Sequence, residues 1–136
     1  MPKYLILKHY RGGPELPGFA PMDQWTPDEM EAHFQYQRDT CQMLIDAGEF
    51  VSAEGLAPTG NWVQYGGPGS KAAHVLDGPF PETKELIAGW FLIDVESEAR
   101  ALEVANHVSA APGKGGEPIY EWLELRPVMS GPPATE

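Results

Sequence analysis

His33 and Asp77 are the two residues whose types best fit proton-transfer chemistry. An imidazole that is oriented by a carboxylate through one ring nitrogen can use the other nitrogen as a general base near neutral pH. His33 falls in a segment with helical periodicity, and Asp77 precedes the turn-forming pair Gly78-Pro79. We therefore predict a catalytic pair of His33 and Asp77. The alternative is structural: a hydrogen-bonded histidine at the edge of the core, and an aspartate that stabilises a turn.

Four further polar residues are candidates for binding a substrate. Gln37 stands one helical turn after His33, so both side chains are expected to point toward the sheet. Lys84 could steady a phenolate or carboxylate. Ser52 and Glu54 alternate on one face of an expected strand and could enter the same cleft. For Lys84, Ser52 and Glu54 the alternative is an ordinary solvated side chain.

Metal ions and cofactors have no recognisable motif in this sequence. The histidines at positions 9, 33, 74 and 107 lack paired spacing such as HxxxH. The glycine-rich run at 66–70 lacks the lysine motif of a phosphate-binding loop and a following helix, so it predicts a hairpin turn instead. We expect no metal and no cofactor.

Composition narrows the class of protein and of partner. The 136 residues suit one domain, predicted at 1–128, followed by a flexible tail at 129–136. The net charge of -11 repels the phosphates of nucleic acid and an anionic membrane surface. Cys41 has no partner for an internal disulfide and is expected to fill the core. With no signal-peptide core and no long apolar stretch, the sequence predicts a cytoplasmic protein.

Periodicity and turn residues predict strands and helices in alternating order. A helix is expected from Thr26-Pro27-Asp28-Glu29, which has the pattern of a capping box, to about Ala47. A second helix should begin after Ser97 and end before Pro112-Gly113. The first helix should turn an apolar stripe to the sheet, formed by Met30, Phe34, Cys41, Leu44 and Ile45. Strands are expected at 3–10, 49–56, 61–65, 72–76, 87–95 and 119–128.

This order predicts an α+β protein with an antiparallel sheet and both helices on one face, the ferredoxin-like split βαβ arrangement. The strand at 87–95 is the most apolar and should be central. The other face of the sheet then needs a cover, and a second copy of the chain is the natural one. The aromatic residues that two helices would leave uncovered are Trp62, Tyr65, Trp90, Tyr120 and Trp122.

The run from Asp77 to Glu85, DGPFPETKE, resembles the signature of the YCII-related domain family in its DGPF branch. The usual string there is DGPFAETKE, so only Pro81 departs from it. Similar segments follow in the family's order at Tyr4–Leu7, Trp25–Met30, Val51–Leu56 and Glu124–Val128. The resemblance covers most of the chain, apart from residues 12–22 and the tail.

The resemblance implies a dimeric α/β-barrel with a pocket in each half that holds a histidine and an aspartate, which map onto His33 and Asp77. It also implies an activity like that of a lyase or dehydrochlorinase, since one relative looks like a dehydrochlorinase of chlorinated hydroquinones. The alternative is a non-catalytic dimeric binding or accessory protein linked to sigma-factor signalling. Under either hypothesis the partners are a second copy and an unidentified small molecule.

Overall fold

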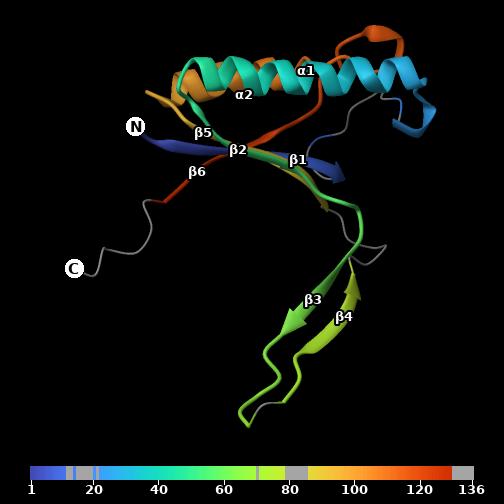
Figure 1. Ribbon diagram of the computed structural model, residues 1–136, viewed down its shortest axis with the longest axis vertical. Helices are drawn as coiled ribbons and strands as arrows, with labels where there is room; N and C mark the ends of the chain where they lie inside the picture. Colours follow the sequence, from blue (N-terminus) through green and yellow to red (C-terminus); the bar gives the residue numbers. More distant parts are fainter. Residues whose placement is uncertain (12–13, 15–19, 21, 70, 79–85, 130–136) are drawn as a thin grey trace.

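The computed structural model describes residues 1–11, 14, 20, 22–69, 71–78 and 86–129 as an α+β fold (Figure 1). The strands are β1 (Lys3–Arg11), β2 (Phe50–Gly55), β3 (Gly60–Gln64), β4 (His74–Gly78), β5 (Leu86–Asp94) and β6 (Glu124–Pro127). The helices are α1 (Pro27–Asp46) and α2 (Glu98–Ser109), with short 3-10 helices η1 (Met22–Gln24) and η2 (Lys114–Gly116). The predicted tail lies outside the described residues, apart from Met129.

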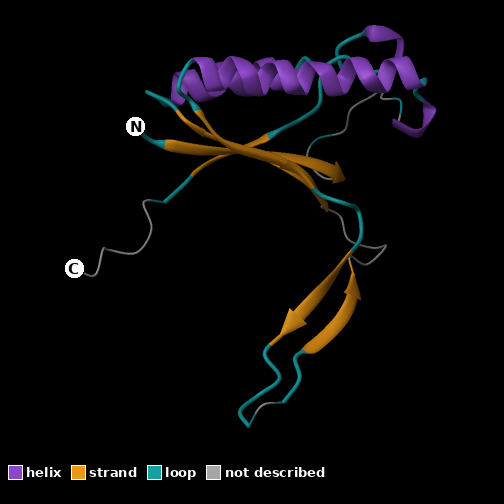
Figure 2. Ribbon diagram, in the orientation of Figure 1, coloured by secondary structure: helices purple, strands orange, loops and turns teal. Residues whose placement is uncertain are grey.

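Four strands form the main sheet in the order β2-β5-β1-β6, and every neighbouring pair is antiparallel. This order is consistent with a ferredoxin-like sheet in which β5 and β1 are central, as the sequence predicted for β5. Both helices lie on one face of the sheet (Figure 2). The β3–β4 hairpin, which we call the arm, is a separate two-stranded sheet inserted between β2 and β5.

The core lies between the helices and the sheet. Alternate residues of the two central strands point into it, because a strand turns successive side chains to opposite faces. The helices close the core with small and branched side chains that let them approach the sheet. Its buried members are Ile6, Leu44, Phe91, Ile93, Val95, Ala101, Val104 and Val108.

Both helices begin where the sequence predicted. The Thr26 hydroxyl accepts a hydrogen bond from the Glu29 amide at 3.2 Å, and the Glu29 carboxylate accepts one from the Thr26 amide at 2.8 Å. This reciprocal pair is a capping box, which satisfies two of the amides that a helix start leaves free. At α2 the Ser97 hydroxyl accepts from the Arg100 amide at 3.1 Å.

The inward face of α1 differs from the predicted apolar stripe. Its buried residues are His33, Thr40 and Leu44, whereas Phe34 and Ile45 are 41% and 51% exposed. The positions of apolar residues alone do not predict this face of the helix, because two of its three buried residues are polar. The buried Thr40 hydroxyl has a hydrogen-bond partner, because it donates to the Tyr36 carbonyl at 2.8 Å. This bond offsets the free energy lost when the hydroxyl leaves water.

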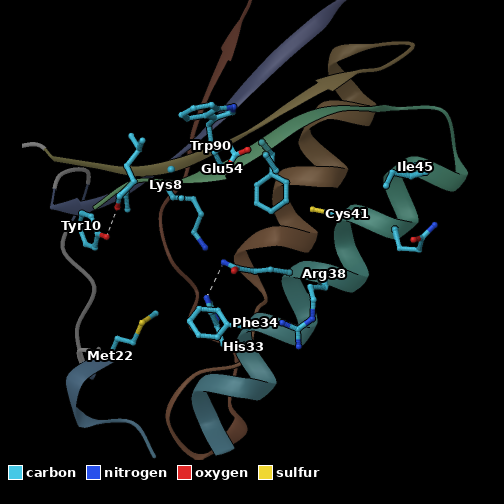
Figure 3. Close-up of a pocket in the computed structure, with 18 residues that line it drawn as sticks. Lys8, Tyr10, Met22, His33, Phe34, Arg38, Cys41, Ile45, Glu54 and Trp90 are labelled. Carbon is cyan, nitrogen blue, oxygen red and sulfur yellow. Dashed lines mark hydrogen bonds between the residues drawn. The ribbon is translucent and has the colours of Figure 1, made fainter. Parts of the chain in front are cut away.

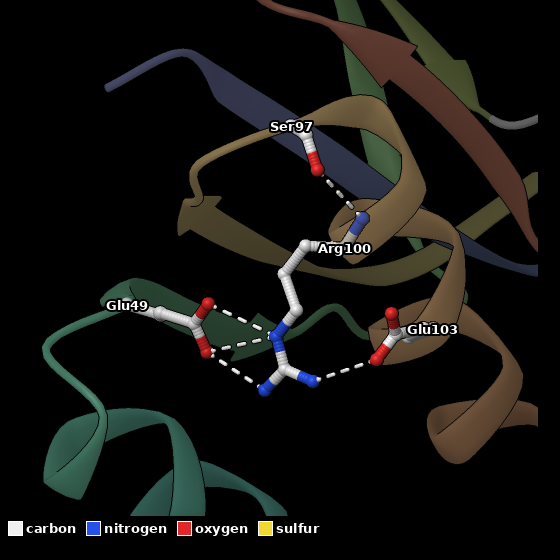
Figure 4. A network of polar contacts seen from close by, with 4 residues as sticks. All are labelled: Glu49, Ser97, Arg100 and Glu103. Carbon is white, nitrogen blue, oxygen red and sulfur yellow. Dashed lines mark hydrogen bonds and ion pairs between the residues drawn. The ribbon is translucent and has the colours of Figure 1, made fainter.

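An ion pair joins the turn before β2 to the first turn of α2 (Figure 4). The Arg100 guanidinium donates to both carboxylate oxygens of the largely buried Glu49, at 2.8 to 3.2 Å, and it also reaches Glu103. A forked contact of this kind satisfies both charges, so that removing either partner would leave the other uncompensated.

Two strand predictions need correction. The last strand was expected over 119–128, but β6 spans only Glu124–Pro127, and Tyr120 has φ 56°, a left-handed conformation that interrupts an extended chain. Asp77-Gly78 was expected in a turn, but both residues belong to β4, where Asp77 is opposite Asn61. A side chain at Gly78 would lie 2.6 Å from the Trp62 ring, so glycine is needed there for the indole to pack across the arm.

The face of the sheet opposite the helices has no helix over it in the described chain (Figure 2), and we call it the bare face. The pairs Ile6–Phe91 and Tyr4–Ile93 face the core. Because successive side chains of a strand point to opposite faces, the neighbouring pairs Leu5–Leu92 and Leu7–Trp90 lie on the bare face. Neither described helix is long and apolar enough to span a lipid bilayer.

Candidate functional site

A pocket of about 680 Å³ lies between α1 and the ends of β1, β2 and β5 (Figure 3). This volume is in the range of sites that hold small molecules. Its walls are largely apolar, and they include Met22, Phe34, Cys41, Ile45, Leu56 and Phe91. The lining also has polar residues, so the site combines an apolar volume with an imidazole and charged groups. These residues are Lys8, His33, Gln37, Arg38, Gln42 and Glu54.

His33 is held in one tautomer by its two neighbours. The residue is only 3% exposed, and its Nδ1 lies 3.0 Å from the Pro112 carbonyl oxygen. Since a carbonyl oxygen can only accept, Nδ1 carries the hydrogen and donates it. Nε2 then has a free electron pair, which accepts a hydrogen bond from the Gln37 side-chain amide at 3.1 Å. The ring therefore presents a basic nitrogen beside the pocket.

Burial lowers the pKa of His33 below its ordinary value of 6.5, and the nearby Lys8 ammonium lowers it further. The hydrogen bond to Pro112 and the charge of Glu121 act in the opposite direction. The imidazole is consequently neutral at pH 7, which is the form that can accept a proton.

Lys8 and Glu121 are site residues that the sequence interpretation missed. Figure 3 shows Lys8 extending from β1 toward His33, and its Nζ lies 3.2 Å from the Glu121 carboxylate. A signal was available for Lys8: it follows Tyr4 and Ile6 at every second position, so it had to share their core-facing side. Glu121 had no such signal, because it precedes β6 in a segment without regular structure.

The segment after α2 places the Pro112 carbonyl. The Glu29 carboxylate accepts a hydrogen bond from the Gly115 amide at 2.6 Å, and this bond lowers the pKa of Glu29 together with the one from Thr26. Gly113 lies so close to Trp25 that a side chain there would come within 2.9 Å of the indole. The same indole packs edge-on against the His33 ring, with the ring centres 5.2 Å apart. The α1 start thus fixes both the histidine and its carbonyl partner.

The predicted substrate-binding residues have different positions. Gln37 lines the pocket with His33. Glu54 borders the pocket at the end of β2, but it is opposite Trp90, so its side chain is on the bare face of the sheet. Ser52 instead accepts a hydrogen bond from the Trp90 indole at 3.2 Å. It is adjacent to Ala53, which packs on the core, so its side chain points to the bare face. Lys84 lies outside the described residues.

The described chain does not bring Asp77 to His33. Asp77 is exposed on the arm, which projects from the sheet on the side away from the helices (Figure 1). The orienting role that the sequence interpretation gave to this carboxylate is filled at His33 by the Pro112 carbonyl. The catalytic pair of His33 and Asp77 remains a prediction.

Metal binding and nucleophilic catalysis by cysteine have little support among the described residues. No three histidine, cysteine, aspartate or glutamate side chains there are grouped so that they could hold a metal ion. Burial raises the pKa of the Cys41 thiol, so this group stays protonated at neutral pH and is a poor nucleophile.

Comparison with known proteins decides the family. The sequence model of the YCII-related domain matches residues 3–122. The chain belongs to this family. A curated protein of Rhizobium meliloti (strain 1021), described only as uncharacterised, is 30% identical over 104 residues, which cover 76% of this chain and 79% of the relative. The resemblance found in the sequence is confirmed for the family, and membership of the DGPF branch remains a prediction.

In this YCII-related domain the site places a neutral base and a cation at one apolar pocket. A base can take a proton from a weakly acidic group, and a nearby ammonium can stabilise the anion that results. These two functions need no further group from the described part of the chain. They suit a small, mostly apolar molecule that carries one acidic proton.

Proposed function

We propose that this YCII-related domain binds a small, mostly apolar molecule with one weakly acidic group and accepts its proton on Nε2 of His33. The observation that carries this proposal is the hydrogen bond from Nδ1 to the Pro112 carbonyl, which leaves Nε2 as the basic nitrogen. Phenols and activated carbon acids fit the description, because they become anions on losing one proton.

The proposed reaction is a simple proton transfer. An O–H or C–H bond of the ligand breaks, the proton moves to Nε2, and the electron pair stays on the ligand as an anion beside the Lys8 ammonium. The new imidazolium has a hydrogen at each ring nitrogen, and Nδ1 keeps its bond to Pro112. If the ligand carries chloride next to the carbanion, the chloride departs with its bonding pair and a double bond forms. That elimination is the lyase reaction.

A second candidate is ligand binding without chemistry. It is favoured by the Gln37 amide, which donates to Nε2 and occupies the electron pair that a base would use. For catalysis Gln37 must turn away when the ligand enters. If it does not, the pocket binds the molecule and leaves its proton in place.

We also propose that the protein is a homodimer whose bare face is covered by a second copy. Support comes from the aromatic residues that a single chain leaves exposed. Trp62 and Tyr65, on or beside the arm, and Tyr120 and Trp122, before β6, are all more than half exposed, which would be costly in a lasting monomer. Trp90, the predicted aromatic residue on the bare face, is only partly exposed.

A chromogenic nitrophenol tests the pocket directly, because its anion absorbs visible light and the neutral phenol does not. Titration of the protein into nitrophenol near neutral pH is expected to increase the phenolate band, with saturation. His33→Gln should bind with little ionisation, whereas His74→Gln, on the exposed arm, should behave as wild type. Binding with equal ionisation in His33→Gln would remove the base role and leave the binding role. Failure of phenols, and of aromatic carboxylates tested by thermal shift, to bind at all would refute both.

A further inference from the structure

The pocket is longer than its proton-accepting end requires. Its lining residues on α1 extend from His33 to Ile45 (Figure 3), and a separation of 12 positions along a helix corresponds to about 18 Å. The imidazole and the Lys8 ammonium, which receive the acidic group of the proposed ligand, are both at the His33 end. A molecule the size of one phenol ring would therefore occupy only part of the 680 Å³ and leave the part toward Ile45 unused.

The side of α1 that borders this long part is apolar. Phe34, Cys41 and Ile45 recur at i, i+7 and i+11, so they share one side of the helix. The sequence predicted that they would pack on the sheet, but in the structure they line the pocket, and Phe34 and Ile45 are exposed. Because burial raises the pKa of the Cys41 thiol, this group stays neutral and acts as a small apolar side chain. Most of the predicted stripe thus faces the pocket.

The polar side chains that α1 adds to this part of the pocket wall have partners outside it. Arg38 donates to the side chains of Glu31 and Gln35, which lie toward the start of the helix. The Gln42 amide donates to the Asp46 carboxylate at 2.9 Å. The alkyl stems of such side chains cover apolar surface while their polar ends stay in contact with water. Neither polar end needs a partner from the pocket.

The opposite wall of the pocket is apolar as well. Ala53 on β2 and Phe91 on β5 are cross-strand partners that face the helices. The backbone at the end of β2 is already paired: the Leu56 amide donates to the Ala88 carbonyl at 2.7 Å, and the Leu56 carbonyl accepts from the Tyr10 hydroxyl at 2.6 Å. A ligand in this part of the pocket therefore meets hydrocarbon on both sides.

We propose that the ligand of this pocket is amphipathic, with an acidic head group at His33 and Lys8 and an apolar tail that lies along α1 toward Ile45. This inference rests on the proton-accepting pocket proposed above and names the class of molecule that fills it. Beyond a head of one ring, the remaining length suits a tail of roughly eight carbons, since carbon–carbon bonds are about 1.5 Å long. Phenols and acidic dicarbonyl compounds that carry an alkyl chain belong to this class.

A series of 2-nitrophenols with longer and longer alkyl chains tests the tail. The chains are ethyl, butyl, hexyl and octyl, placed opposite the hydroxyl, and each phenol is used below the concentration at which it forms micelles. The phenolate band gives the affinity and counts only ligand whose head has reached a base. Because each methylene that enters the apolar part leaves water, we expect the affinity to rise about threefold per methylene up to the octyl chain.

Ile45→Gln places a polar amide at the far end of the pocket. It should lower the affinity ratio of octyl to hexyl from about tenfold to about twofold. Leu102→Gln on α2 is the matched control, because Leu102 is 55% exposed and is not among the residues that line the pocket, and it should keep the wild-type ratio. Circular dichroism shows whether each variant is folded. A wild-type ratio in Ile45→Gln, or an equal loss of affinity for every chain length, would overturn the placement of the tail.

The head and the tail of the proposed ligand can fail separately. If 2-nitrophenol itself is ionised with saturation but affinity does not change with chain length, the proton-accepting pocket stands and the amphipathic ligand is wrong. If thermal shift shows affinity that rises with chain length and depends on Ile45, while no phenolate forms, the tail site stands and the base role of His33 is wrong. If no phenol of the series binds, both proposals are wrong.

Discussion

The helix-covered side of the sheet and the arm contain similar apolar residues but differ in what surrounds them. Leu44 on α1 is fully buried beneath its own sheet, whereas Leu76 on the arm is 59% exposed. The first region obtains its order from contacts inside the chain, and it holds the pocket rigidly. The arm has a regular hairpin without such contacts. Among the described residues, the helix-covered side is therefore packed by its own chain, whereas the apolar side chains of the arm face solvent.

Matched leucine substitutions should give the largest difference between the two regions. Leu44→Ala should lower the free energy of unfolding by about 3 kcal/mol at any protein concentration, because it leaves a cavity in the core. Leu76→Ala should cost less than about 1 kcal/mol in dilute solution, where its site faces water. Urea unfolding at two protein concentrations measures both. Equal costs in dilute solution would mean that the arm is packed within its own chain.

The second prediction compares the pocket histidine with the arm aspartate. His33→Gln should reduce turnover of a substrate, once one is found, by about 100-fold, as loss of a general base does, and it should remove the protein-dependent increase of the nitrophenolate band. Asp77→Asn should stay within about twofold, because the Pro112 carbonyl already orients the ring. Should Asp77→Asn match His33→Gln, the carboxylate must act at the pocket, and within this fold it would have to come from the arm of another copy.

A third prediction concerns pH and the pocket side alone. Because the pKa of His33 is lowered in the folded state, the folded protein binds fewer protons here than the unfolded chain. This contribution to stability is fully present above the unfolded pKa of 6.5 and is lost as the pH falls below it toward the folded pKa. His33→Gln should flatten the fall in melting temperature over that range, and His74→Gln should not. An identical slope in both variants would contradict the assignment.

The smallest effect is expected from Lys8→Met, which removes the cation that lowers the pKa of His33. The pKa of His33 should rise in an NMR titration, and Nδ1 should remain the protonated nitrogen of the neutral ring. Lys3→Met, at the exposed start of β1, is the control and should leave the titration unchanged. A lower pKa in Lys8→Met would show that Lys8 does not act on the ring through its charge.

Local patterns predicted much of the fold because each depends on neighbours in sequence. The capping box at Thr26, the Ser97 cap and the central position of the strand at 87–95 are confirmed. The shortened last strand was not predictable from alternation, since Tyr120 leaves the extended region although it falls in an alternating pattern. The inward face of α1 was wrongly predicted for a related reason. His33 bonds to Pro112, and the Thr40 hydroxyl lies 3.1 Å from Nε2 of His107 on α2, and apolar periodicity does not detect such distant polar partners.

The site was partly predictable in the same sense. His33 and Gln37 could be found because they are one helical turn apart on the side that meets the sheet. The oxygen that orients His33 belongs to the backbone of Pro112, and every residue type has such an oxygen, so side-chain identities gave no hint of it. The sequence interpretation assigned the orienting role to Asp77, because a carboxylate is the side chain usually expected to orient a catalytic histidine.

The contact between His33 and Pro112 joins positions 79 apart along the chain, and this separation has a consequence for biosynthesis. A growing polypeptide that has not yet exposed residue 112 at the ribosome contains the imidazole but nothing that selects its tautomer. The fixed tautomer at this position is thus acquired late, when the second half of the domain closes onto the first. Truncated products that end before residue 112 would carry the histidine without its orientation.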